Sequence, residues 1–179
     1  MPLANLFILL AQALLLVLSA FCSASETALF GLTYNDRLQL KKSSPRAAAA
    51  VEKLLDEPRA LLVTLLMANM TVNVVFLALG SVLVLGFENA ALGATINAVT
   101  VVLLVALGEV SPKLIAASQR VRLCTLLAPA VMVLFRVIRP VRGFVEMGVI
   151  APLTRLLSPR EPSSSSVTVD ELSALVELG

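Results

Sequence analysis

The sequence predicts an all-α membrane protein with three transmembrane helices per subunit, short cytoplasmic helices between the first two spans, and a juxtamembrane helical belt. Hydrophobic residues make up 58% of the 179-residue chain, whereas a soluble domain carries about 45–50%. The mean hydropathy is +0.93. Several apolar runs are long enough to cross a bilayer, and the Lys and Arg residues gather on particular connections. These observations exclude a soluble globular domain.

Three segments, 3–30, 59–86 and 91–116, are each apolar over enough residues to cross about 30 Å of hydrocarbon as a helix. The first resembles a secretory signal only in its position. No Lys or Arg precedes Arg37, and the apolar run is longer than the core of such signals. We therefore expect the first segment to remain as a span.

The distribution of cations predicts the orientation of the spans. The connection 33–59 carries six Lys and Arg residues, and we expect it to form two short helices, 35–42 and 46–56. The connection near 86–93 contains Glu88 and no cation. Because cytoplasmic connections are enriched in Lys and Arg, the sequence predicts which ends of the spans face the cytoplasm. The N-terminus is expected outside and the C-terminus in the cytoplasm.

A fourth apolar stretch, 123–135, is bounded by arginines and contains thirteen uncharged residues. As a helix these residues reach only about 20 Å, which is short for a span. We therefore expect residues 119–157 to form interfacial helices, broken near Pro140 and Gly143, with arginines at the lipid headgroups. A fourth true span is the alternative.

The chain divides by composition into three parts. Residues 1–157 are expected to form the transmembrane domain with its juxtamembrane helices, and 158–167 a Pro- and Ser-rich linker. In 168–179, a threonine N-cap precedes an acidic first turn and an apolar stripe. This last part is expected to begin a truncated cytoplasmic helical domain.

Polar residues gather in each span instead of scattering. Asn69 and Asn73 lie four residues apart and therefore on one helical face. Pro112 has no N–H to bond the carbonyl of Gly108, so that carbonyl is freed. Because consecutive spans run in opposite directions, the clusters fall at one depth, between the midplane and the cytoplasmic side. They comprise Ser19, Ser23, Ser25, Glu26 and Thr27 in the first span, Asn69 and Asn73 in the second, and Gly108, Glu109, Pro112 and Lys113 in the third.

Together these clusters offer hydroxyl, amide, carbonyl and carboxylate oxygens. The chain has no His and only two Cys, so the usual ligands of zinc and copper are scarce. Oxygen donors suit hard cations, and the donor types alone do not separate Mg²⁺ from Ca²⁺ or Na⁺. A carboxylate inside a span is a candidate functional group by default. The sequence therefore predicts a cation site.

Each cluster also has a structural interpretation. The serines and Thr27 can bond carbonyls of their own helix, the asparagines can pair between helices, and Glu109 can form a salt bridge with Lys113 or Arg120. The basic cytoplasmic face is explained by topology and anionic lipid, without nucleic acid. No phosphate-binding loop, metalloprotease motif or Cys-x-x-Cys pair occurs in the sequence, and the serines have no His partner. The sequence predicts no enzyme.

Three motifs resemble the transmembrane domain of the CorC/CNNM family of magnesium transporters. They are Ser23-Ala24-Ser25-Glu26-Thr27-Ala28-Leu29, Asn69 with Asn73, and Gly108-Glu109-Val110-Ser111-Pro112-Lys113, in the expected order. The resemblance implies a homodimer and an inward-facing pocket that holds dehydrated Mg²⁺. It also implies that 168–179 begins an acidic helical bundle, followed in the full-length protein by a cytoplasmic CBS-domain pair.

By the same resemblance the metal ligands would be Ser23, Ser25, Asn69, the Gly108 carbonyl and Glu109. Glu26, Asn73, Pro112 and Lys113 would be additional polar or structural residues of the site. The function expected is Mg²⁺ transport across the inner membrane, as sodium-coupled export by alternating access, with membrane lipids and possible Na⁺ as further partners. The alternative function is a magnesium-sensing membrane scaffold that regulates other transporters.

Overall fold

The computed structural model describes residues 2–85, 89–145 and 148, and every element among them is helical. The linker 158–167 and the expected helix 168–179 lie outside the described residues. The chain divides into two compact units, 1–139 and 140–179. The elements are α1 (Pro2–Phe30), α2 (Tyr34–Ser43), α3 (Pro45–Leu55), α4 (Pro58–Val84), α5 (Ala90–Leu103), the π-helix η1 (Leu104–Val110), α6 (Ser111–Ser118) and α7 (Arg120–Val145).

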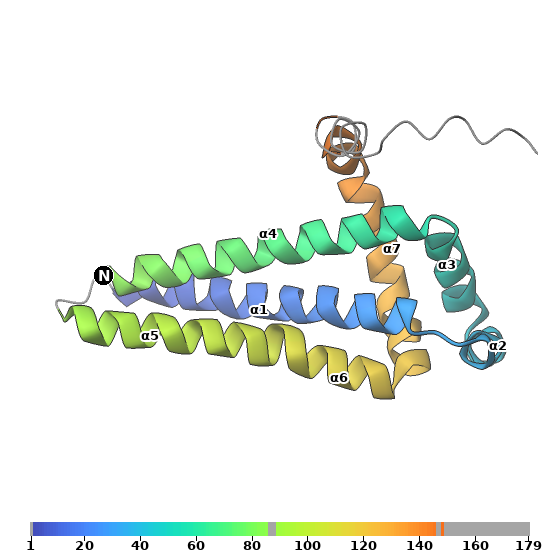
Figure 1. The fold of residues 1–179 in the computed structure, drawn as a ribbon, viewed down its shortest axis with the longest axis horizontal. Coiled ribbons are helices and arrows are strands. Elements are labelled where there is room, and N and C mark those ends of the chain that lie inside the picture. Colours follow the sequence, from blue (N-terminus) through green and yellow to red (C-terminus); the bar gives the residue numbers. More distant parts are fainter. Residues whose placement is uncertain (1, 86–88, 146–147, 149–179) are drawn as a thin grey trace, which may run out of the picture. The chain divides into compact units, whose positions relative to one another are not determined.

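The three expected spans are present as long helices that lie side by side in the first unit. Helix α1 contacts α4, η1 and α6, and α4 contacts α5. In Figure 1, α1 lies between α4 and the continuous rod formed by α5, η1 and α6. The rod Ala90–Ser118 is long and apolar enough to cross a membrane, as are Asn5–Phe30 and Pro58–Val84. These boundaries agree closely with the three segments expected from the sequence.

The third span changes helical register before its proline. From Leu104 to Val110 the backbone is π-helical, and the N–H of Ser111 bonds the carbonyl of Ala106, five residues earlier. Pro112 follows at the start of α6 and, having no N–H, cannot donate a backbone hydrogen bond there. Short π-helical segments often mark functional sites. The proline effect was expected from the sequence, but the π-helical register was not.

The connection between the first two spans contains the two expected short helices, α2 and α3. Thr33 caps α2, since its hydroxyl accepts from the N–H of Asp36 while the Asp36 carboxylate accepts from the N–H of Thr33. The Asp36 carboxylate accepts hydrogen bonds from the backbone N–H and the hydroxyl of Thr33, and these bonds, the backbone one first, hold the pKa of Asp36 below its usual value. Pro45 occupies the first turn of α3, where its missing N–H costs nothing. A salt bridge of 2.6 Å between Lys41 and Glu52 links the two helices.

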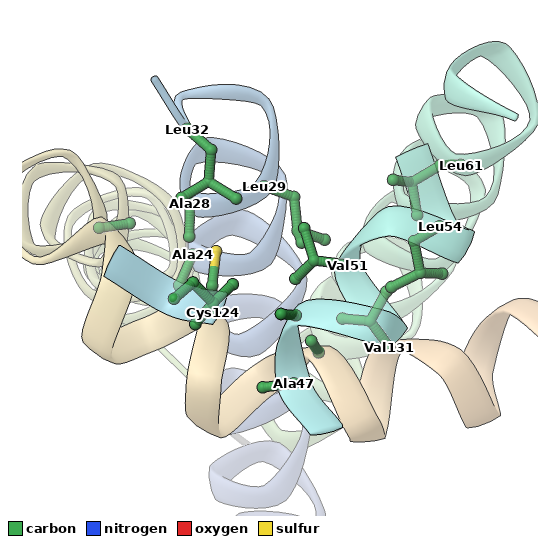
Figure 2. Close-up of a cluster of buried hydrophobic side chains, with 14 of the residues drawn as sticks. Ala24, Ala28, Leu29, Leu32, Ala47, Val51, Leu54, Leu61, Cys124 and Val131 are labelled. Atoms are coloured by element: carbon green, nitrogen blue, oxygen red, sulfur yellow. The ribbon is translucent and has the colours of Figure 1, made fainter. Parts of the chain in front are cut away.

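A cluster of buried apolar side chains joins these short helices to the ends of the long ones (Figure 2). Ala28 and Leu29 of α1 face Val51 of α3 and the start of α7. Every member is at most 8% exposed. This packing fixes the C-terminal end of α1, close to the polar residues described below. The cluster comprises Ala24, Ala28, Leu29, Leu32, Leu40, Ala47, Ala48, Val51, Leu54, Leu61, Leu65, Ala116, Cys124, Ala128 and Val131.

The expectations for the segment after α6 were wrong in two respects. Residues 120–145 form one continuous helix that passes through Pro140 and Gly143 without the expected break. This helix is also long and apolar enough to cross a membrane over Arg120–Phe144, so among the described residues four helices meet that criterion and not three. The sequence count ended at the flanking arginines, although long basic side chains near a helix end can extend toward water while their stems stay in apolar surroundings.

Candidate cation site in the helix bundle

One face of α1 carries the polar side chains that turn toward α4 and toward the rod formed by α5, η1 and α6. Ser19, Ser23 and Glu26 follow one another at spacings of four and three, which places them on a common face. The side chains of Ser19 and Ser23 are fully buried. Ser25, two residues beyond Ser23, is turned about 200° around the helix axis. Its hydroxyl is also fully buried and has no hydrogen-bond partner within the described part of the chain.

Ser19 lies at the centre of the polar contacts. Its Oγ is 2.7 Å from Oδ1 of Asn73, 3.2 Å from Oδ1 of Asn69 and 3.4 Å from the Gly108 carbonyl oxygen. A serine hydroxyl has one proton, so it can donate to only one of these three acceptors at a time. Four oxygens from α1, α4 and η1 therefore meet around a single hydroxyl proton. Such a cluster has more lone pairs than donors, which suits a cation.

Glu109 is held from two directions. Nδ2 of Asn73 donates to its carboxylate at 2.7 Å, and Oγ of Ser23 donates to its backbone carbonyl at 3.1 Å. The described residues do not show the alternative salt bridge between Glu109 and Lys113 or Arg120. Lys113 pairs instead with Glu26 at 3.4 Å, and Arg120 donates to backbone carbonyls. Among the described residues, the Glu109 carboxylate is therefore held by the Asn73 amide and not by a lysine or arginine, and it lies next to the oxygens around Ser19.

Position 108 requires a small residue because the two helices approach closely there. A Cβ built on Gly108 would lie 3.0 Å from Oγ of Ser19, 3.2 Å from Cδ1 of Leu104 and 3.4 Å from Cδ1 of Leu16. Without a side chain, the peptide of Gly108 can present its carbonyl oxygen to Ser19. Pro112 contributes indirectly, since it is buried at the start of α6 and carries no N–H for that carbonyl.

The structure brings together most, but not all, of the residues predicted from the sequence. Ser23, Asn69, Asn73, Gly108 and Glu109 all take part in the contacts around Ser19 and Glu109. Glu26 and Lys113 form a separate ion pair, and Ser25 is on another face of α1. Sequence reasoning placed Ser19 among the polar residues but omitted it from the proposed ligands. The signal that identifies it is its spacing of four from Ser23.

The fold and this site define a class: a multi-pass helical membrane protein with an oxygen-lined polar site between its spans. The CNNM family model, described as the cyclin M transmembrane N-terminal domain, matches residues 10–179. The chain therefore belongs to the CorC/CNNM family.

A curated relative is the UPF0053 protein of Haemophilus influenzae, 36% identical over 117 residues. The alignment covers 65% of this chain and 27% of that protein. The chain thus aligns with about a quarter of the length of its relative.

Proposed function

We propose that this protein transports Mg²⁺ across the cell inner membrane, by sodium-coupled export. The observation that carries the proposal is the meeting of four oxygens from three helices around the single proton of Ser19, beside the Glu109 carboxylate. Membership of the CorC/CNNM family supports it. Mg²⁺ prefers near-octahedral oxygen coordination at about 2.0–2.1 Å, and hydroxyl, amide, carbonyl and carboxylate donors are the kinds present here.

The proposed ligands are the hydroxyls of Ser19 and Ser23, Oδ1 of Asn69, the carbonyl of Gly108 and the carboxylate of Glu109. Asn73 positions that carboxylate through its 2.7 Å hydrogen bond. Ser25 is not included, because its position on α1 turns its hydroxyl away from Ser19 and Ser23. Binding of Mg²⁺ would replace the hydrogen bonds of the two serine hydroxyls with metal contacts. Either serine can rotate its hydroxyl to present a lone pair.

Alternating access requires that the helices around the site change their arrangement. The π-helical segment η1 is the place where the third span departs from regular α-helix, and it carries both Gly108 and Glu109. A shift between π- and α-helical register there would move the carbonyl and the carboxylate together. Because Mg²⁺ gives up its water reluctantly, exchange of water for protein oxygens is expected to be slow, which favours a carrier over an open channel.

The proposed orientation has the N-terminus outside and the helices α2 and α3 in the cytoplasm, since the connection 33–59 carries six cations. We place the C-terminus in the cytoplasm for two reasons. Helix α7 crosses the direction of α1 in Figure 1, and Cys124 and Val131 of α7 lie in the apolar cluster with the cytoplasmic helix α3. We also propose a homodimer in contact with membrane lipids. Single cysteines at Leu3 and at Ser173, probed with impermeant thiol reagents, test the orientation, and cross-linking in the membrane tests the dimer.

The decisive experiment is isothermal titration of Mg²⁺ into the purified protein, with Ca²⁺ and Na⁺ as competitors. We expect saturable binding that is lost in Ser19→Ala, Asn69→Ala and Glu109→Gln. The matched control is Thr71→Ala, because Thr71 lies on α4 between the asparagines, is exposed, and bonds only the carbonyl of Met67 in its own helix. Undiminished binding in all three site variants would remove the proposed site.

Flux distinguishes a transporter from a magnesium-sensing scaffold. In vesicles that contain the full-length protein, we expect Mg²⁺ movement that follows an imposed sodium gradient and stops in Asn69→Ala. Binding without flux would leave the site in place and favour the sensing scaffold.

A further inference from the structure

An ion pair lies next to the candidate site, toward the end of the bundle that carries α2 and α3. Nζ of Lys113 on α6 lies 3.4 Å from Oε2 of Glu26 on α1. The Glu26 side chain is 25% exposed and that of Lys113 is 46% exposed. Neither residue touches the oxygens around Ser19 through a hydrogen bond found in the structure.

The position of the pair follows from the helix spacings. Glu26 is three residues beyond Ser23, and Lys113 is four residues beyond Glu109. Helices α1 and α6 contact each other, and α1 and the α5–η1–α6 rod run in the same direction (Figure 1). Each member of the pair therefore lies one helical turn, roughly 5 Å, past a residue of the candidate site and toward the same end of the bundle.

The pair is poorly suited to a purely stabilising role. Partly exposed Lys–Glu pairs contribute about 0–1 kcal/mol to stability, and the flexible lysine stem allows Nζ to leave at little cost. A divalent cation that approaches from this end attracts Glu26 and repels Lys113 at the same time. Glu26 can exchange Lys113 for the cation without a change in the backbone.

We propose that Glu26 is the carboxylate that first meets the incoming Mg²⁺, and that Lys113 neutralises Glu26 while the site is empty. Glu26 accepts hydrogen bonds from waters that Mg²⁺ still carries, and Lys113 is released as the ion arrives. The ion then passes one turn further to the oxygens around Ser19. This inference rests on the proposed Mg²⁺ site and adds the residues that control access to it.

The proposal predicts opposite effects for the two partners of one ion pair. Glu26→Gln removes an attraction for Mg²⁺ and leaves Lys113 unneutralised, so the dissociation constant should rise about three- to tenfold at low salt. Lys113→Gln removes a competitor, so the dissociation constant should fall by a similar factor. Both effects should shrink at high salt, because the groups are partly exposed. Lys113→Arg, which keeps the charge, should behave as wild type.

The experiment is Mg²⁺ titration calorimetry on the full chain at about 0.02 M and about 0.5 M monovalent salt, which spans a large change in screening. The variants are Glu26→Gln, Lys113→Gln, Lys113→Arg and the Glu26→Gln/Lys113→Gln double variant, whose affinity should return toward wild type. Lys42→Gln, at an exposed position on α2, controls for the loss of one positive charge elsewhere and should change nothing.

A thermal melt of each variant separates binding from folding. If both single variants weaken Mg²⁺ binding together, or neither changes it, the pair is structural and the proposal is overturned. An equal gain in affinity from Lys42→Gln would also overturn it, because the effect would then be one of net charge. Absence of wild-type binding, or binding that survives Asn69→Ala, overturns the proposed site itself and is therefore recognisable as a different failure.

Discussion

Replacing Gly108 by alanine should separate the geometry of the site from the stability of the fold. The added methyl carbon would lie 3.0 Å from Oγ of Ser19 and 3.2 Å from Cδ1 of Leu104, so the neighbours must give way by a few tenths of an ångström. Overpacking of this kind costs about 1–3 kcal/mol, and the better helix propensity of alanine returns up to about 1 kcal/mol. The net loss of stability should therefore be about 0–3 kcal/mol.

The effect on Mg²⁺ binding should be measurable separately from the effect on folding. The same displacement moves two proposed ligands, the hydroxyl of Ser19 and the carbonyl of Gly108, away from each other. Mutation of groups that merely orient metal ligands costs about 10–100-fold in affinity, so a loss of about tenfold or more is expected here. Calorimetric titration of Mg²⁺ measures the affinity, and a thermal melt in detergent measures stability.

The chain offers a matched control in Gly143→Ala. A Cβ at Gly143 would meet nothing within 4 Å, so this variant should bind Mg²⁺ as wild type does and melt no lower. Wild-type affinity in a folded Gly108→Ala variant would refute the reasoning, because the close approach of Ser19 to Gly108 would then have no role in binding. A loss of affinity in Gly143→Ala would show that the assay responds to a glycine-to-alanine change that meets no neighbour.

Three further predictions concern the fold. Leu54→Ala, at a position with 0% exposure in the apolar cluster, should lower stability by about 2–5 kcal/mol, whereas Leu126→Ala, 71% exposed, should change the melting temperature little. Thr33→Val should raise the pKa of Asp36 part of the way toward its usual value, because the backbone hydrogen bond remains; a carbon-detected NMR titration measures this. Since the folded pKa of Asp36 is depressed, the stability that the Thr33 cap contributes is present above the unfolded pKa and is lost as the pH falls through the folded pKa. A Thr33→Val variant whose acid melting matches wild type would contradict this contribution. Lys41→Gln removes an ion pair with side chains 56% and 54% exposed and should cost less than about 1 kcal/mol; a larger loss in a thermal melt would show that the pair holds α2 and α3 together.

The helices between and within the spans were predictable because their signals are local. The apolar lengths gave the three long helices almost to the residue, and Pro45 marked the boundary between α2 and α3. The continuous helix α7 was not predicted, because the uncharged stretch was counted only between arginines. Charged residues near a helix end do not by themselves end the helix, and Pro140 did not end it either.

For the site, spacing predicted which residues share a face but not which face turns toward the other spans. The Ser-Ala-Ser-Glu-Thr run drew attention to Ser23 and Ser25 equally. A separation of two residues puts them on different sides of a helix, so only one can share a site with residues at spacings of four and seven. Ser19 satisfies that spacing with Ser23 and Glu26. The partner of Lys113 was likewise undetermined, since Glu109 lies four residues before it and Glu26 lies on a different helix.

The strongest physical argument for a cation is the imbalance of donors and acceptors around Ser19. A polar network buried between membrane helices is tolerated when its members satisfy one another. Here the single proton of Ser19 faces three oxygens, and the amide of Asn73 that lies nearby donates to Glu109. The arrangement becomes favourable when a cation supplies the positive charge that these oxygens lack from hydrogen-bond donors. Ser19→Ala removes the proton and one oxygen but leaves the asparagines, so it should weaken Mg²⁺ binding more than it destabilises the bundle.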